Sequence, residues 1–139
     1  MVLYILDTDH LSLLQRGHAP LKAHVQSISP KQIAMTVISA EEMLLGRLAQ
    51  IRRAKNASQR IQAYAWLDKT LAFLGAFELL PYDATAEQYF ENLRAQNLRV
   101  GSQDLRIAAI ALSGNASVVT RNQRDFERVP NLSVSDWSV

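Results

Sequence analysis

Four acidic residues, far apart in the chain, stand beside predicted strand ends or helix starts, and these groups could do chemistry together: Asp7, Glu42, Asp104 and Asp125. Ligand sets made of oxygen alone suit Mg²⁺ or Mn²⁺, hard ions that prefer octahedral geometry. A bound ion of this kind can polarise a phosphodiester, lower the pKa of a water and stabilise the leaving oxygen. The residue types therefore indicate metal-dependent hydrolysis of phosphodiesters, provided that the fold brings the four side chains together.

Two of these acids have a structural alternative in helix capping. Asp7 could cap the first helix, although Thr8 and Asp9 are better placed, and Asp9 is the expected cap. Glu42 could complete a capping box with Ser39. One carboxylate cannot readily serve the Ser39 amide and a metal ion together, so the role of Glu42 stays open.

The remaining acids also have simpler explanations. Glu41 could take either role of Glu42. Asp104, in the first turn of a predicted helix, would interact favourably with the helix dipole by about 0.3–1 kcal/mol without any function. Asp125 lies in a polar segment, where aspartate is typical of a turn. The functional interpretation therefore depends on the joint placement of the four acids rather than on any one of them.

The elements that must position these acids alternate between strands and helices. The apolar run Val2–Leu6 predicts a strand buried on both faces, and further strands are predicted at 33–37, 79–81, 116–120 and 132–134. Helices are predicted between them: from Thr8 or Asp9 to Leu14, from Pro20 to Ile28, from Ala40 into a basic end at 47–60, a return helix after the turn at 56–58, from Asp83 or Thr85 to before Asn97, and from Ser102 to Leu112. This alternation predicts a mostly parallel sheet covered on both faces. Such sheets bind ligands beyond the carboxyl ends of their strands, and right-handed crossovers would bring the acids to that one rim.

Length and composition restrict the class of protein. A chain of 139 residues predicts one domain, and the absence of cysteine excludes disulfides and thiolate metal sites. No charged leader and no apolar run of membrane-spanning length is present, so a soluble, cytoplasmic protein without membrane contact is expected. With four of its 13 acidic residues neutralised by an ion, the chain would keep nine against 15 basic residues, a balance that attracts polyanions.

Few other residues indicate chemistry. His10, His18 and His24 show no metal-ligand spacing and are expected at the surface or partly buried. No glycine-rich phosphate loop follows any predicted strand. Trp137, close to the end of the chain, is expected to fix the last strand to the body of the domain.

Four ordered motifs carry a family resemblance: Leu6–Asp9, Ala40–Gly46, Gly101–Ala109 and Val119–Pro130. With these motifs the chain resembles a PIN-domain ribonuclease, and it looks most like the VapC-type toxins of bacterial type II toxin–antitoxin modules. The resemblance runs nearly end to end. It implies a single PIN-like domain over residues 1–139, built as a three-layer α/β/α sandwich around a central, mostly parallel sheet.

The resemblance also implies roles for particular residues. The family's acidic quartet maps onto the same four acids, and Glu42 rather than Glu41 matches because it directly precedes Met-Leu-Leu-Gly. Thr8 and Thr120 match polar positions that line the pocket, and Asn122 stands where some members carry an acid. Asp9 departs from the more usual asparagine, and Gln103 stands before the third acid where the familiar pattern has a proline after the glycine. Neither departure removes a ligand.

The implied activity is endonucleolytic cleavage of RNA with Mg²⁺ or Mn²⁺, leaving 5′-phosphate and 3′-hydroxyl ends. A VapB-type antitoxin protein and a homodimer are implied likewise. Four arginines are proposed to hold the flanking RNA strand, although each could simply be a solvated charge: Arg47, Arg99, Arg121 and Arg124.

Two other functions remain possible from the sequence. The chain could be a non-catalytic module that binds its antitoxin through the basic hairpin at 47–60 and the first helices. Alternatively, Asp7 and Asp9 could be the nucleophile and the acid/base of a haloacid-dehalogenase-like phosphatase. The phosphatase is disfavoured because Leu11 stands where threonine or valine is expected and no lysine followed by a late acidic pair is found.

Overall fold

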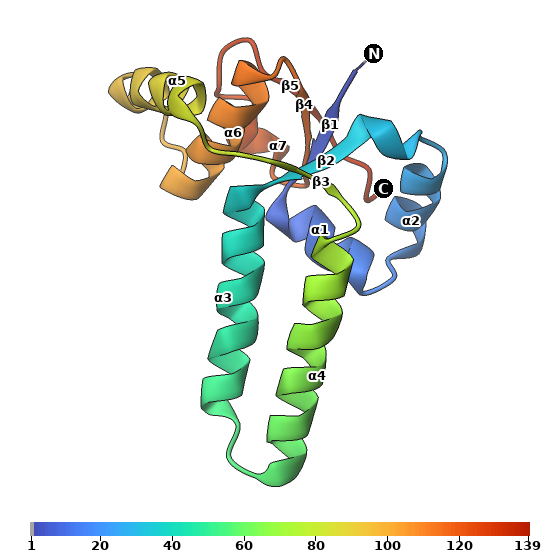
Figure 1. Ribbon diagram of the computed structural model, residues 1–139. Helices are drawn as coiled ribbons and strands as arrows, with labels where there is room; N and C mark the ends of the chain where they lie inside the picture. Colours follow the sequence, from blue (N-terminus) through green and yellow to red (C-terminus); the bar gives the residue numbers. More distant parts are fainter. Residues whose placement is uncertain (1) are drawn as a thin grey trace.

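A five-stranded parallel sheet lies at the centre of the structure, a computed structural model that describes residues 2–139 (Figure 1). The strand order is β3-β2-β1-β4-β5, and every neighbouring pair is parallel. The strands are β1 Tyr4–Leu6, β2 Ile33–Thr36, β3 Glu78–Leu80, β4 Ser117–Val119 and β5 Ser133–Ser135. The predicted parallel α/β fold is confirmed, with each strand close to its expected position.

Helices connect the strands and cover both faces of the sheet (Figure 1). They are α1 Thr8–Gln15, α2 Ala19–Gln26, α3 Val37–Arg53, α4 Ala57–Leu74, α5 Ala84–Ala95, α6 Ser102–Ser113 and α7 Gln123–Phe126, with a 3-10 turn η1 at Pro30–Gln32. Because side chains alternate along a strand, Ile5 packs into a core with α5 and α6, whereas Leu6 packs into a second core with α1 and α2. Two cores on opposite faces of one sheet make the three-layer sandwich.

The long helices α3 and α4 form a hairpin that extends well beyond the sheet (Figure 1). Only their sheet-proximal ends join the second core, through Met43 of α3 and through Phe73 and Leu74 of α4. Farther along, the hairpin leaves several large apolar side chains more than half exposed: Leu45, Ile61, Tyr64 and Leu71. The domain thus presents apolar helix surface that its own chain does not cover.

The predicted caps of three helices, α1, α3 and α6, were wrong, and each of these helices begins at or carries one of the four acids. The cap of α1 is Asp7, whose Oδ1 accepts a hydrogen bond from the His10 backbone N–H at 2.8 Å, and not Thr8 or Asp9. The φ and ψ of Asp7, −73° and 174°, are extended, so the residue that directly follows β1 has the backbone conformation of an N-cap. Asp9 lies in the first turn of the helix instead.

The predicted capping box of α3 was also wrong. Strand β2 ends at Thr36, whose side chain accepts the Ser39 N–H at 3.2 Å, so α3 begins at Val37. Glu42 consequently lies in the second turn, where no backbone N–H needs it. Similarly, Gly101 rather than Ser102 is the N-cap of α6, and Asp125 lies in the short helix α7 rather than in a loop.

The C-terminal segment packs against the first two helices. Trp137 is 4% exposed, and its ring contacts Tyr4 and His24, which confirms its predicted role. His10 is fully buried beneath it, so the expectation of a surface or partly buried side chain was wrong for this histidine. In the described residues, no helix has the length and apolar character that crossing a membrane requires.

Removing the Trp137 side chain should destabilise the protein because the ring fills a closed site between β1 and α2. Trp137→Ala is expected to lower the free energy of unfolding by about 3–5 kcal/mol in urea titrations. Tyr64→Ala, which removes an aromatic ring that is 58% exposed on α4, is the matched control and should change the free energy by about 0.5 kcal/mol or less. Equal losses in the two variants would contradict the anchoring role.

Candidate active site

The buried carboxylate of Asp7 lies where strands β1 and β4 end. Its Oδ2 accepts a hydrogen bond from the Thr120 hydroxyl at 2.6 Å, and its Oδ1 accepts the His10 N–H at 2.8 Å. The backbone N–H of Asp7 donates to the Val119 carbonyl at 3.1 Å, which continues the pairing of the two strands. Two strands more than 100 residues apart in the chain therefore fix one carboxylate in position.

The surroundings of Asp7 favour its neutral form when no cation is present. Burial raises its pKa to about 6, while the hydrogen bonds from Thr120 and His10 act in the opposite direction. The negative charges of Asp9 and Asp104 raise this pKa further. A cation held beside the carboxylate would offset both the burial and the repulsion.

Glu42 of α3 approaches the same rim and is held there by a neutral hydroxyl group. The Thr8 hydroxyl donates to Glu42 Oε1 at 2.6 Å and lies 2.9 Å from the Ser39 hydroxyl. Thr8 was expected to line the pocket, and it touches one of the four acids. Ser39 is fully buried beside it.

Asp104 and Asp125 meet through the side chain of Asn122. The Asn122 Nδ2 donates to Asp104 Oδ2 at 3.3 Å and to Asp125 Oδ2 at 3.0 Å. The pKa of Asp104 is raised, first by burial and then by the charge of Glu42, with a smaller contribution from Asp125; the Asn122 hydrogen bond lowers it. Each of the four acids thus lies within electrostatic reach of at least one other.

The donor set fits a hard divalent cation that retains much of its water. Within residues 2–139, no three histidine, aspartate or glutamate side chains are close enough to coordinate one ion by themselves. Mg²⁺ is usually held by only one or two carboxylates and keeps several waters, so a cage made entirely of protein is not required. Burial, and to a smaller extent the charges of neighbouring acids, raise the pKa of Asp7 and of Asp104, and a bound ion would offset both effects.

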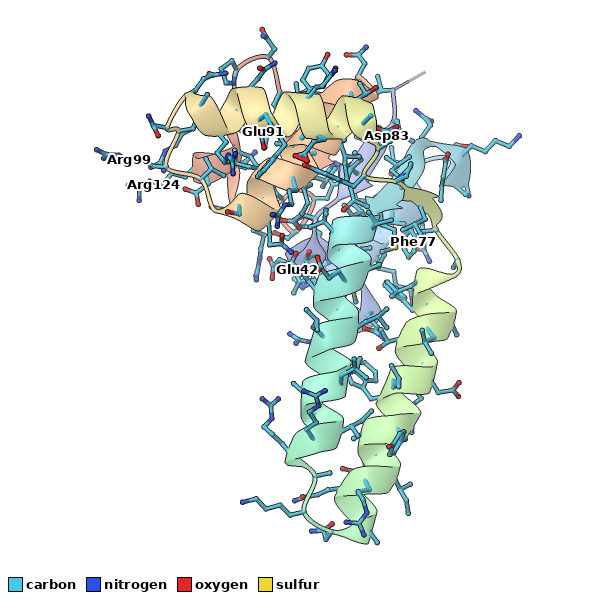
Figure 2. The ribbon with its side chains drawn as sticks, turned by 60° about the vertical axis from the view of Figure 1, so that its left-hand side comes forward. Glu42, Phe77, Asp83, Glu91, Arg99 and Arg124 are labelled. Carbon is cyan, nitrogen blue, oxygen red and sulfur yellow. The ribbon has the colours of Figure 1, made fainter. Side chains whose placement is uncertain are left out.

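The four arginines expected to hold RNA do not form one cluster. Arg121 lies closest to the acids, where it makes a bidentate pair with Asp9 at 2.7 and 3.1 Å. Arg99 and Arg124 point outward from the body of the domain (Figure 2). The guanidinium of Arg47 lies over the ring of Trp66, 5.0 Å from its centroid, so this residue belongs to the α3–α4 hairpin rather than to the acidic rim.

Three residues at the site were not expected from the sequence. The sequence indicates only a capping role for Ser39, whereas in the structure its hydroxyl contacts that of Thr8. Arg128 places Nη1 3.3 Å from Asp125 Oδ1 and also donates to the Arg99 carbonyl at 2.8 Å. His10 was treated as ordinary, although its position three residues after Asp7 is the position whose N–H an N-cap side chain binds.

The chain is similar to proteins of one known family. The profile of the family described as "PIN domain" matches residues 4–132. The chain is 30% identical to "Ribonuclease VapC" of Rickettsia bellii over 134 residues, covering 94% of this chain and 92% of that one. It is 39% identical to "tRNA(fMet)-specific endonuclease VapC" of Salmonella typhimurium over 69 residues, about half of each chain.

Two solved structures have the same fold over nearly the whole chain. One is VapBC2 from Rickettsia felis bound to a DNA fragment from its promoter, with a TM-score of 0.79, 25% identity and coverage of 98% and 99%. The other is DNA-bound VapBC from Salmonella typhimurium, with a TM-score of 0.78, 25% identity and coverage of 99% of both chains.

The raised pKa of Asp7 predicts how stability depends on pH in the absence of metal. The neutral carboxyl stabilises the fold below the ordinary pKa of 3.8, and this contribution is lost as the pH rises through about 6. We expect the wild type to lose about 3 kcal/mol of unfolding free energy between acidic and neutral pH relative to Asp7→Asn. Urea titrations at several pH values with EDTA present measure the difference.

The matched control is Asp83→Asn, which alters the N-cap of α5 rather than that of α1. Asparagine caps a helix about as well as aspartate, so both variants should fold. Asp83→Asn should keep the wild-type slope of stability against pH. If the stability of the wild type followed the same course with pH as that of Asp7→Asn, the pKa of Asp7 would not be raised in the folded protein.

Proposed function

The chain belongs to the PIN-domain family and is a VapC-type ribonuclease, and on that premise we propose that Asp7, Glu42, Asp104 and Asp125 bind Mg²⁺ or Mn²⁺ for RNA hydrolysis. The observation that carries this proposal is the electrostatic coupling of acids from four separate segments at one rim of the sheet. Such repulsion destabilises the metal-free protein, and an ordinary structural role would not require it.

The proposed site separates two tasks among the chain's own residues. Asp7 and Asp104, the two acids whose burial raises their pKa, would hold the ion directly, and Glu42 and Asp125 would act from either side of Asp104. Thr120, Thr8 and Asn122 would keep the carboxylate oxygens oriented by donating hydrogen bonds to them. A bound ion supplies charge neutralisation at the phosphodiester and lowers the pKa of an attacking water.

Contact with the RNA strand is proposed for arginines outside the acidic pocket. Arg121 is half-exposed at the rim while paired with Asp9, so its charge stays close to the place where a phosphate would lie. Arg124 and Arg99 extend the positive charge outward from there (Figure 2). Contacts of this kind bind the backbone without reading sequence and weaken as salt rises. Arg47 is not proposed to contact RNA, because its guanidinium stacks on Trp66 in the hairpin.

A protein partner of the VapB type is proposed from the structures that resemble this chain. Their titles name VapBC complexes from Rickettsia felis and Salmonella typhimurium. The exposed apolar side chains of the α3–α4 hairpin, among them Ile61 and Tyr64, would gain from being covered by such a partner or by a second copy of this chain in a homodimer. The RNA substrate is proposed only as a class, because the tRNA-specific relatives match about half of the chain.

The phosphatase alternative is disfavoured by the geometry of Asp9. Its two carboxylate oxygens are both engaged by Arg121, so it is not free to exchange protons with a group on Asp7. The binding-module alternative predicts no cleavage at all. An RNA cleavage assay therefore distinguishes the ribonuclease from the binding module.

Binding of the ion should stabilise the wild type more than a variant that lacks Asp7. Mn²⁺ is expected to raise the melting temperature of the wild type in a concentration-dependent manner, because only the folded state brings the acids together. Asp7→Asn should show a much smaller shift, and Asp83→Asn should respond like the wild type. Equal shifts for all three proteins would exclude a metal site at these acids.

RNA cleavage should depend on the same acids. We expect purified wild type to cut RNA with Mn²⁺ or Mg²⁺ and to lose this activity in EDTA. Asp104→Asn should be inactive because it removes a proposed ligand from α6, whereas Asp83→Asn should remain active. The assay uses one structured and one unstructured RNA, and the products are separated on a denaturing gel. A folded, metal-binding wild type that cuts neither RNA would favour the non-catalytic binding module.

A further inference from the structure

The three histidines of the chain all contact its last few residues. His10 Nε2 accepts the Trp137 backbone N–H at 3.2 Å. The His24 ring stacks on the Trp137 indole with centroids 4.2 Å apart, and His18 Nε2 lies 2.9 Å from the Ser138 carbonyl oxygen. The C-terminal segment is therefore held by α1, by α2 and by the turn between them.

Among these histidines, His10 is the one that also reaches the acidic rim. Its side chain is fully buried, and its backbone N–H already donates to Asp7 Oδ1 at 2.8 Å. Its ring Nδ1 lies 3.6 Å from the same oxygen. Within the described residues this nitrogen is one of the few buried polar atoms that have no hydrogen-bond partner.

The C-terminal segment determines which ring nitrogen carries the proton. Because Nε2 accepts the Trp137 N–H, the single proton of a neutral imidazole must be on Nδ1, the nitrogen that faces Asp7. Asp136 Oδ1 lies 3.4 Å from Nε2, but it already accepts hydrogen bonds from the N–H and the hydroxyl of Ser138. The buried Nδ1–H is left with Asp7 as its nearest acceptor.

We propose that His10 is a positioning residue. The C-terminal segment fixes the tautomer of its ring, and the resulting Nδ1–H orients the Asp7 carboxylate. A shift of roughly 0.6 Å in that carboxylate would convert the 3.6 Å approach into an ordinary hydrogen bond. Burying a donor without a partner is unfavourable, so this shift is also favoured energetically. Histidine–carboxylate contacts of this kind commonly orient the groups that hold metal ions.

This arrangement leaves Asp7 able to bind an ion. Each carboxylate oxygen accepts two hydrogen bonds or ligand contacts. Thr120 occupies one position on Oδ2, and His10 directs its backbone N–H and its ring toward Oδ1. The carboxylate is thereby fixed in rotation while Oδ2 keeps a free lone pair. The inference rests on the proposed metal-binding function, and it assigns His10 as the group that orients Asp7.

Two substitutions separate orientation of Asp7 from anchoring of the C-terminal segment. His10→Asn keeps an N–H donor near the place of Nδ1 and loses the acceptor for Trp137. His10→Gln keeps a polar group near the place of Nε2 and loses the donor toward Asp7. We expect His10→Gln to bind Mn²⁺ about 10- to 100-fold more weakly than the wild type by calorimetry, and His10→Asn to retain more of the affinity.

The stability of each variant is measured beside its affinity. His24→Ala is the matched control, because it weakens the packing of Trp137 without facing Asp7, and it should keep wild-type Mn²⁺ affinity. A His10→Gln protein that binds Mn²⁺ as well as or better than His10→Asn would overturn the positioning role and leave His10 as an anchor only.

Nuclear magnetic resonance of the metal-free full chain tests the tautomer directly. The ring nitrogens of His10 should show the proton on Nδ1, and Asp7→Asn should shift the Nδ1 signal while the His24 signals stay unchanged. A proton on Nε2, or no response to Asp7→Asn, would overturn the proposal even if the two variants fail to fold. A wild type that binds no Mn²⁺ would instead refute the proposed function, and the tautomer measurement would still decide the contact.

Discussion

The burial of a carboxylate at the end of the central strand is the constraint on which the rest of the site depends. Burial raises the pKa of Asp7 to about 6, and yet the residue must remain there because its backbone joins β1 to β4 and its side chain caps α1. Neutral donors, Thr120 and the His10 N–H, compensate only part of the lost hydration. The protein therefore keeps an electrostatic strain that a divalent cation would relieve.

Neutral groups donate most of the hydrogen bonds that the four acids accept. Hydroxyl and amide groups from Thr8, Thr120 and Asn122 orient the carboxylates without neutralising them. Two arginines lie near these groups: Arg121 forms an ion pair with Asp9, and Arg128 forms one with Asp125. A site built in this way favours a small cation at its centre and a polyanion at its edge.

The proposed metal site and the exposed apolar surface of the hairpin lie in different parts of the structure. The acids lie at the rim of the sheet, whereas the α3–α4 hairpin carries exposed apolar residues away from it (Figure 1). Because α3 contains Glu42 near its first turns and Leu45 and Leu48 farther along, a partner on the hairpin contacts the helix that also positions one of the acids.

The sequence by itself determined the order of strands and helices, the parallel sheet and the family, because these follow from local periodicity and from motifs of adjacent residues. It also singled out the four acids that we propose as metal ligands. Only the tertiary structure decided which residues cap α1 and α3, since Asp7 and Thr36 act as caps only where their strands end against neighbouring strands. It also decided that His10 is buried, because the residue that covers it, Trp137, is 127 positions later in the chain. Contacts between distant segments depend on the packing of the whole sheet, and no local pattern in the sequence records them.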